Sequence, residues 1–229
     1  MKKTILTLTS MLFAGFLQAE TISLDFGLNT YESTGNWNNF SGTTSFRFED
    51  NTPFLMAENM INSLGVATTV DFYFMDFNSG ASAGIGGINY TTDTSATTGL
   101  PLSATRDGLF VTDGAPTAAN FEIRGLEANT DYNLTFFAGA DASPVRADTN
   151  WISDGQTVSI SPNLNTAAVT IFNAQSDGSG TLGIRLESTA GGSAGLWHSL
   201  EIATIPEPSS LILFSMALGS VLLLRRRIK

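Results

Sequence analysis

The sequence contains no cysteine and a single histidine, His198, among its 229 residues. Without cysteine there is no disulfide, no thiol nucleophile and no cysteine-based metal site, so an exported domain of this sequence must be held together by burial. One histidine excludes a zinc site built from several histidines. Lysine is also missing from the whole central region, because the only lysines are Lys2, Lys3 and Lys229.

The central region is strongly acidic. All 21 acids lie between Glu20 and Glu207, where the only cations are five arginines, and the net charge of this part is therefore −16. Nucleic-acid binding requires basic patches, so this composition excludes nucleic acid as a partner. An acidic surface favours solubility and the binding of cations.

The N-terminus has the three parts of a secretory signal peptide. Lys2 and Lys3 are followed by a mostly apolar run from Ile5 to Leu17, and Ala19 provides a small residue at the expected cut. We therefore predict that residues 1–19 are a cleaved signal peptide that directs export through the Sec translocon.

The C-terminus, residues 205–229, combines three further features. Pro206, Glu207 and Pro208 precede an uncharged run from Ser209 to Leu224, and a cationic end follows, with Arg225, Arg226, Arg227 and Lys229. As a helix, the run would measure about 24 Å, which is short for a hydrocarbon core of about 30 Å, but arginines at its end can reach the headgroups. We expect a single transmembrane helix with its cationic end in the cytoplasm and the region before it outside.

This order of Pro-Glu-Pro, apolar helix and arginine cluster resembles the PEP-CTERM sorting signal of Gram-negative bacterial surface proteins. The resemblance implies an exosortase-type transpeptidase as partner, with processing near Pro206, Glu207 and Pro208. It further implies inner-membrane anchoring before processing, then a place at the cell surface or in the extracellular matrix, often with exopolysaccharide and biofilm.

Residues 20–204 predict an all-β domain. Short runs with β-branched and aromatic residues recur between Gly, Asp and Pro turn signals, which favours a sandwich or barrel. The expected strands are Thr21–Phe26, Ser45–Phe48, Thr69–Phe77, Asn120–Gly125, Tyr132–Gly139, Thr157–Ile160, Ala168–Phe172, Thr181–Glu187 and Leu196–Ala203.

Three other segments carry expectations of their own. Phe54 to Leu64 is the only helix-like stretch, and 80–87 and 91–99 read as long loops. The segment Gly125 to Tyr132 resembles the tyrosine corner of fibronectin type III domains, in which the tyrosine hydroxyl bonds to upstream backbone.

The region is nearly twice as long as an Ig-type domain, so we predict one larger, jelly-roll-like β-sandwich with its first and last strands paired. This layout is similar to galactose-binding-like and malectin-like jelly rolls.

Catalytic motifs are weak. Gly191 to Gly195 matches G-x-S-x-G, which would make Ser193 an esterase nucleophile, but no helix-forming run follows and no acid-then-histidine order can be built after Ser193. His198 is expected to be a rim or packing residue beside Trp197. We predict a non-catalytic protein; the alternative is a secreted polysaccharide hydrolase or esterase whose site has no recognised motif.

Two kinds of binding site remain open. Asp107, Asp113, Asp154 and Asp177 precede glycines in expected turns and could supply oxygen ligands to a structural calcium, although turn chemistry alone also explains them. Among the aromatic residues, Trp37 and Trp151 have the most polar neighbours and are the predicted sugar-stacking pair, with core packing as the alternative. Extracellular polysaccharide is the corresponding partner.

Overall fold

A computed structural model describes residues 20–42, 46–48, 53–77, 82–85, 90–112, 117–141, 146–189 and 195–205. Residues 20–204 form one compact unit. The expected signal peptide, Pro206 to Pro208 and the apolar run with its arginines lie outside the described residues. Within the described part, no helix is long and apolar enough to cross a membrane.

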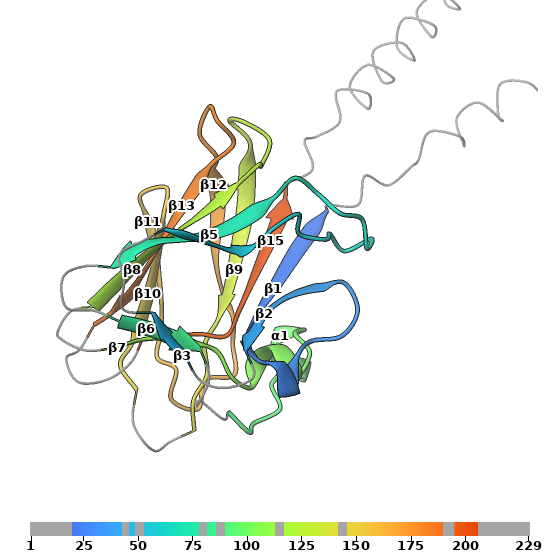
Figure 1. Cartoon of the computed structure of the whole chain (residues 1–229). Coiled ribbons are helices and arrows are strands. Elements are labelled where there is room, and N and C mark those ends of the chain that lie inside the picture. The colour runs from blue at the N-terminus through green and yellow to red at the C-terminus, as the bar shows by residue number, and fades with distance from the viewer. Residues whose placement is uncertain are drawn as a thin grey trace, which may run out of the picture. The chain divides into compact units, whose positions relative to one another are not determined.

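The regular secondary structure of the described chain consists almost wholly of strands, which form three sheets (Figure 1), so the predicted all-β fold is confirmed. One sheet has five strands in the order β12 (Val169–Gln175), β9 (Asp131–Phe137), β15 (Ser199–Thr204), β1 (Thr21–Leu28) and β2 (Trp37–Gly42). A second has six strands in the order β11 (Gln156–Ile160), β10 (Thr149–Ser153), β13 (Leu182–Ser188), β8 (Thr117–Arg124), β5 (Asp71–Phe77) and β4 (Phe54–Ala57). A third has four strands in the order β14 (Gly195–Trp197), β7 (Leu109–Thr112), β6 (Ser82–Ile85) and β3 (Phe46–Phe48).

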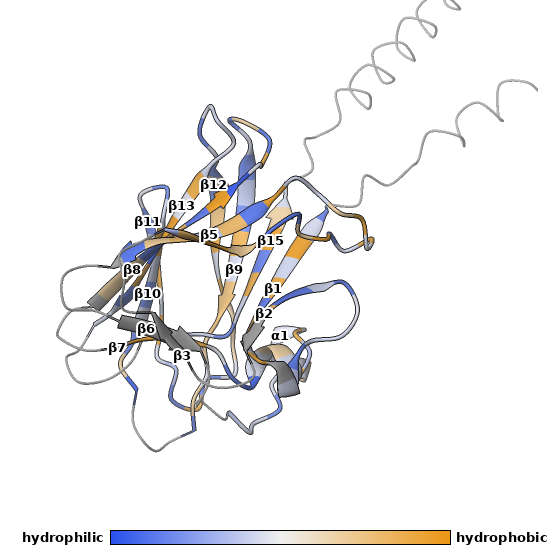
Figure 2. Cartoon of the chain, in the orientation of Figure 1, coloured by the Kyte–Doolittle hydropathy of each residue, from blue (hydrophilic) through white to orange (hydrophobic). Residues whose placement is uncertain are grey.

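The main core lies between the five-stranded and six-stranded sheets, as in a sandwich. Trp197 is fully buried, and its ring contacts Phe26 from one sheet and Phe121 from the other, at centroid distances of 4.8 and 5.2 Å. Phe136 stacks on Trp151 across the same interface at 5.2 Å. Hydrophobic and hydrophilic residues alternate along strands such as β13 (Figure 2), where Leu182, Ile184 and Leu186 are buried, so such a strand presents one apolar face to this core.

The first and last strands are neighbours, as predicted. β1 and β15 pair antiparallel, with Thr21 opposite Ala203 and Asp25 opposite Ser199. β2 then adds in parallel to the other side of β1. The two ends of the domain are therefore closed against each other by backbone hydrogen bonds.

The tyrosine corner is also confirmed. The Tyr132 hydroxyl accepts a hydrogen bond from the Glu127 backbone N–H at 3.0 Å, and the ring is buried in the main core. Ala128 and Asn129 form the turn of this corner, with Asn129 in the left-handed region at φ 53°. This corner fixes the crossing from the six-stranded to the five-stranded sheet.

The expected helix from Phe54 to Leu64 is wrong. Its first part forms β4 at the edge of the six-stranded sheet, and Asn59 then has a φ of 47°, which no helix tolerates. The Asn62 side chain closes the following turn by accepting from the backbone N–H groups of Leu64 and Val66. Pairing with β5 thus overrides a local pattern that suits either state.

The structure also differs from the expected loops and strands at several places. β6 lies within 80–87, and a short helix α1 (Ser95–Thr98) lies within 91–99. Two one-turn 3₁₀ segments, η1 (Asn29–Tyr31) and η2 (Ser103–Thr105), were not expected, nor were β2, β7 and β10. β2, with two Asn and a Gly, carries little β signal. β7 and β10 contain β-branched and aromatic residues, but their runs of four and five residues are short.

Candidate functional site

The predicted sugar-stacking pair is not formed. Trp151 is fully buried and stacked on Phe136, so it offers no ring face to a ligand, and its part of the prediction is wrong. Trp37 is half-buried on β2 and packs against a small second core of Tyr90, Leu100 and Phe137. An aromatic platform of both tryptophans is excluded by this burial.

His198 is a packing residue, not a surface acid or base. It is fully buried, its ring contacts Phe137 edge-on, and its Nδ1 accepts a hydrogen bond from the Gly139 N–H at 3.3 Å. Burial lowers the pKa of His198 to about 3, so the imidazole is neutral at neutral pH. Ser193 lies outside the described residues.

The acids proposed as calcium ligands are dispersed. Asp107 is buried, whereas Asp154 and Asp177 lie in exposed turns, and Asp113 is outside the described residues. Asp177 organises its own turn, since its Oδ1 accepts from the Ser179 and Thr181 N–H groups at 2.8 and 2.9 Å. Across the described ranges, no three His, Asp or Glu side chains are grouped so that they could hold one metal ion.

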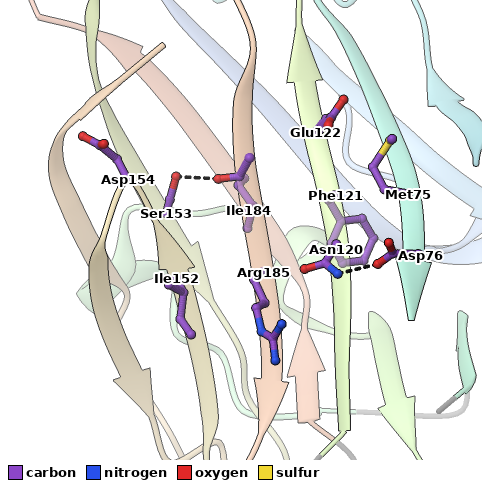
Figure 3. Close-up of a pocket in the computed structure, with 11 residues that line it drawn as sticks. Met75, Asp76, Asn120, Phe121, Glu122, Ile152, Ser153, Asp154, Ile184 and Arg185 are labelled. Carbon is purple, nitrogen blue, oxygen red and sulfur yellow. Dashed lines mark hydrogen bonds between the residues drawn. The ribbon is translucent and has the colours of Figure 1, made fainter. Parts of the chain in front are cut away.

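The described residues form a trough on the outer face of the six-stranded sheet, with a volume of about 350 Å³. Four adjacent strands supply it, in the spatial order β10, β13, β8 and β5. Figure 3 shows the side chains that line it, which include Asp76, Asn120, Glu122, Asp154 and Arg185.

Strand register explains why these side chains meet. Asn120 lies opposite Asp76 on one neighbouring strand and opposite Arg185 on the other, and Ile152 continues this row on β10. Directly paired residues project from the same face of a sheet, so the four side chains form one line across the strands. Asn120 Nδ2 donates a hydrogen bond to the Asp76 carboxylate (Figure 3), which fixes the amide.

A second row runs beside the first. Tyr73 pairs with Glu122, and Glu122 pairs with Gly183. A Cβ atom added at Gly183 would meet no atom within 4 Å, so the floor of the trough is bare at this point. A ligand can therefore approach the backbone of β13 at Gly183.

Charged groups at the trough are paired and held in place. Arg124 forms an ion pair with Glu122 at 2.7 Å, and its guanidinium lies over the Tyr73 ring, 4.3 Å from the centroid. Arg185 forms an ion pair with Glu187 at 2.6 Å. The surface therefore presents carboxylates, an amide, guanidinium groups and one tyrosine ring on a rigid sheet.

Sequence reasoning missed this trough. A signal was present: Asn120, Glu122 and Arg124 alternate with apolar residues along β8, and Gly183, Arg185 and Glu187 do the same along β13. Such alternation identifies a solvent-facing sheet surface. It does not reveal that β8 and β13 are neighbours.

Comparison with known proteins bears on both parts of the chain. Residues 204–227 match the model of the PEP-CTERM protein-sorting motif, which confirms that the chain carries this signal. No curated protein sequence matches the chain.

Two solved structures show a distant likeness. One is the crystal structure of the Podospora anserina GH26-CBM35 β-(1,4)-mannanase, with 15% identity and a TM-score of 0.32 over 72% of this chain. The match spans only 29% of the mannanase chain. The other is TmCBM61 in complex with β-1,4-galactotriose, with 8% identity and a TM-score of 0.29 over 59% of this chain and 83% of that one.

Proposed function

We propose that residues 20–204 are an exported, non-catalytic domain that binds carbohydrate in the trough of the six-stranded sheet. The extracellular polysaccharide of the producing cell is the ligand class that suits a sorted surface or matrix protein. The proposal is supported chiefly by the two rows of polar side chains across β10, β13, β8 and β5, which surround the bare position at Gly183.

The chemistry of these rows suits a sugar. Carboxylates accept hydrogen bonds, guanidinium groups donate them and an amide does both, which matches hydroxyl groups that are donors and acceptors at once. Tyr73 adds an aromatic ring at one end of the second row. The guanidinium of Arg124 covers one face of this ring. The partners Asp76, Glu122 and Glu187 hold the amide and guanidinium groups in place, which reduces the entropy lost when a ligand binds.

The C-terminal motif supports the other half of the proposal. The signal at residues 204–227 implies export, anchoring by the C-terminal segment and an exosortase as processing partner. We infer that the apolar run holds the chain in the inner membrane until an exosortase-type transpeptidase acts near Pro206 to Pro208. The domain then passes to the cell surface or matrix. Arg225, Arg226 and Arg227 stop transfer of a marginally short helix, so replacing all three with Ser should weaken anchoring.

A glycan array with residues 20–204 tests the binding half, followed by calorimetry on any oligosaccharide that binds. The sharpest variant is Gly183→Tyr, because a Cβ atom there meets no protein atom within 4 Å and the ring beyond it would occupy the trough. Binding should fall at least tenfold. Asn120→Ala should weaken it less, because only one polar contact is removed.

The matched control is Ala96→Tyr on α1, an exposed position in a segment outside the trough. It should leave binding unchanged. A sugar that binds wild type and Gly183→Tyr equally would place the site elsewhere. A chromogenic hydrolase and esterase panel run on the same preparation separates the enzymatic alternative, since turnover there would overturn the non-catalytic assignment.

A further inference from the structure

A second polar cluster lies on the opposite side of the sandwich, on the outer face of the five-stranded sheet. Strand register places Phe137, Ser199, Asp25 and Asn39 in one row across β9, β15, β1 and β2. Because Leu24 and Phe26 point into the main core, Asp25 between them points outward. It is nevertheless only 2% exposed, because the turn that contains Ser33 and the segment from η2 to Asp107 cover it.

Two buried carboxylates meet under this cover. Gly27 projects from the same face of β1 as Asp25, and a Cβ atom at Gly27 would lie 2.4 Å from Asp107 Oδ1. Asp107, also 2% exposed, therefore occupies the space that a side chain at residue 27 would fill. Residues two apart on a strand are separated by about 7 Å, so the two carboxylates occupy neighbouring positions on this face of the sheet.

Each of the two carboxylates accepts a hydrogen bond at only one of its oxygens. Asp25 Oδ2 accepts from the Ser33 N–H at 2.9 Å, and Asp107 Oδ2 accepts from the Leu28 N–H at 2.8 Å. The other oxygen of each residue, Oδ1, is buried and has no hydrogen-bond partner within the described chain. Buried polar atoms are nearly always paired, so two orphan oxygens in one cluster indicate a missing partner.

Neither Oδ1 forms a hydrogen bond with a side chain of the described residues, and Arg106 Nε, on the residue before Asp107, is also buried without a partner. The nearest cation in sequence is Arg106, whose guanidinium lies over the Tyr31 ring, 4.8 Å from the centroid. Neither of the ion pairs that the structure gives between described residues includes Asp25 or Asp107.

We propose that a hard divalent cation such as calcium binds between Asp25 Oδ1 and Asp107 Oδ1 and joins the segment from η2 to Asp107 to the sheet. Calcium takes six to eight oxygen ligands, and neutral oxygens and water complete such a shell where few carboxylates are available. The hydroxyls of Ser33 and Ser103, 2.8 Å apart, bring neutral oxygens to the same cover. The site goes beyond the proposed carbohydrate binding, since it lies on the other sheet.

The test uses the full chain in a neutral detergent, stripped with EDTA and then titrated with calcium chloride. We expect one calcium per chain by calorimetry. At a calcium concentration about a hundred times the Kd, the melting temperature should rise by about 5–10 °C. Asp25→Asn and Asp107→Asn should each abolish that rise. Asp25→Asn keeps an acceptor for the Ser33 N–H, so its circular dichroism spectrum without calcium should match that of wild type.

Asp177→Asn is the matched control, because it changes an exposed acid that was a calcium candidate on sequence alone. It should retain the full rise in melting temperature with calcium, and so should Gly183→Tyr. Loss of sugar binding in Gly183→Tyr tests the proposed function and does not bear on the calcium site. A rise that persists in Asp25→Asn would overturn the proposal. So would wild-type protein that binds none of calcium, magnesium or manganese, and this measurement decides the matter even if Asp107→Asn does not fold.

Discussion

Acid should destabilise this domain partly through one residue, His198. Its imidazole is fully buried, and burial lowers its pKa to about 3 from the usual 6.5. Below pH 6.5 the His198 side chain binds a proton in the unfolded chain but stays neutral in the folded chain. The contribution of His198 to stability is therefore fully present above pH 6.5 and is lost as the pH falls towards 3. Between pH 7 and pH 4 this loss is about 3 kcal/mol, at about 1.4 kcal/mol for each pKa unit.

The matched variant is His198→Asn. An Asn Oδ1 can occupy the place of the imidazole Nδ1 and accept from the Gly139 N–H, while nothing titrates. Urea unfolding of residues 20–204 at pH 7 and pH 4 gives the free energy of unfolding for both proteins. Carboxylates titrate in both proteins: Asp25, whose pKa burial raises, adds stability as the pH falls, and Asp177, whose pKa its hydrogen bonds lower, removes it. These contributions cancel in the comparison, so between pH 7 and pH 4 the wild type should lose about 3 kcal/mol relative to the variant.

Because His198 is the only histidine, a preparation without a histidine tag gives a single set of imidazole NMR signals. In the folded protein these signals should not shift between pH 8 and pH 4.5. A midpoint near 6.5 in the folded state, or equal acid sensitivity in wild type and variant, would show that the ring is solvated and refute the reasoning.

Three further results are expected. Tyr132→Phe should cost about 1 kcal/mol in urea unfolding, because the Glu127 N–H loses its acceptor in the tyrosine corner. Gly125→Ala should cost more, at least about 2 kcal/mol, because Gly125 has a φ of 79° and its Cβ would lie 2.0 Å from the Thr69 carbonyl oxygen; an unchanged melting temperature would contradict this. Replacing Pro206–Pro208 with Ala should leave membrane insertion intact but block processing, so mass analysis in a host with an active exosortase should find the variant, but not the wild type, ending at Lys229.

The sequence predicted best what depends on neighbours along the chain. The tyrosine corner needs only Glu127 and Tyr132, and the long strands β1, β5 and β13 carry their own β-type residues. The helix expected from Phe54 to Leu64 failed because β4 is fixed by its pairing with β5. Trp151 was misassigned because polar neighbours such as Asn150 project to the opposite face of β10, where alternation hides the burial of the tryptophan.

The trough and the carboxylate pair share the reason why sequence could not find them. Asp76 and Arg185 are far apart in the chain, and they approach only because β13, β8 and β5 are consecutive in the sheet. Asp25 and Asp107 meet because Gly27 leaves a side-chain space empty. In both places a glycine on a sheet surface makes the room, and the polar groups around it come from other strands or covering segments. A glycine in a strand with open space above it, or with a carboxylate in that space, is therefore the feature that connects this fold to its binding chemistry.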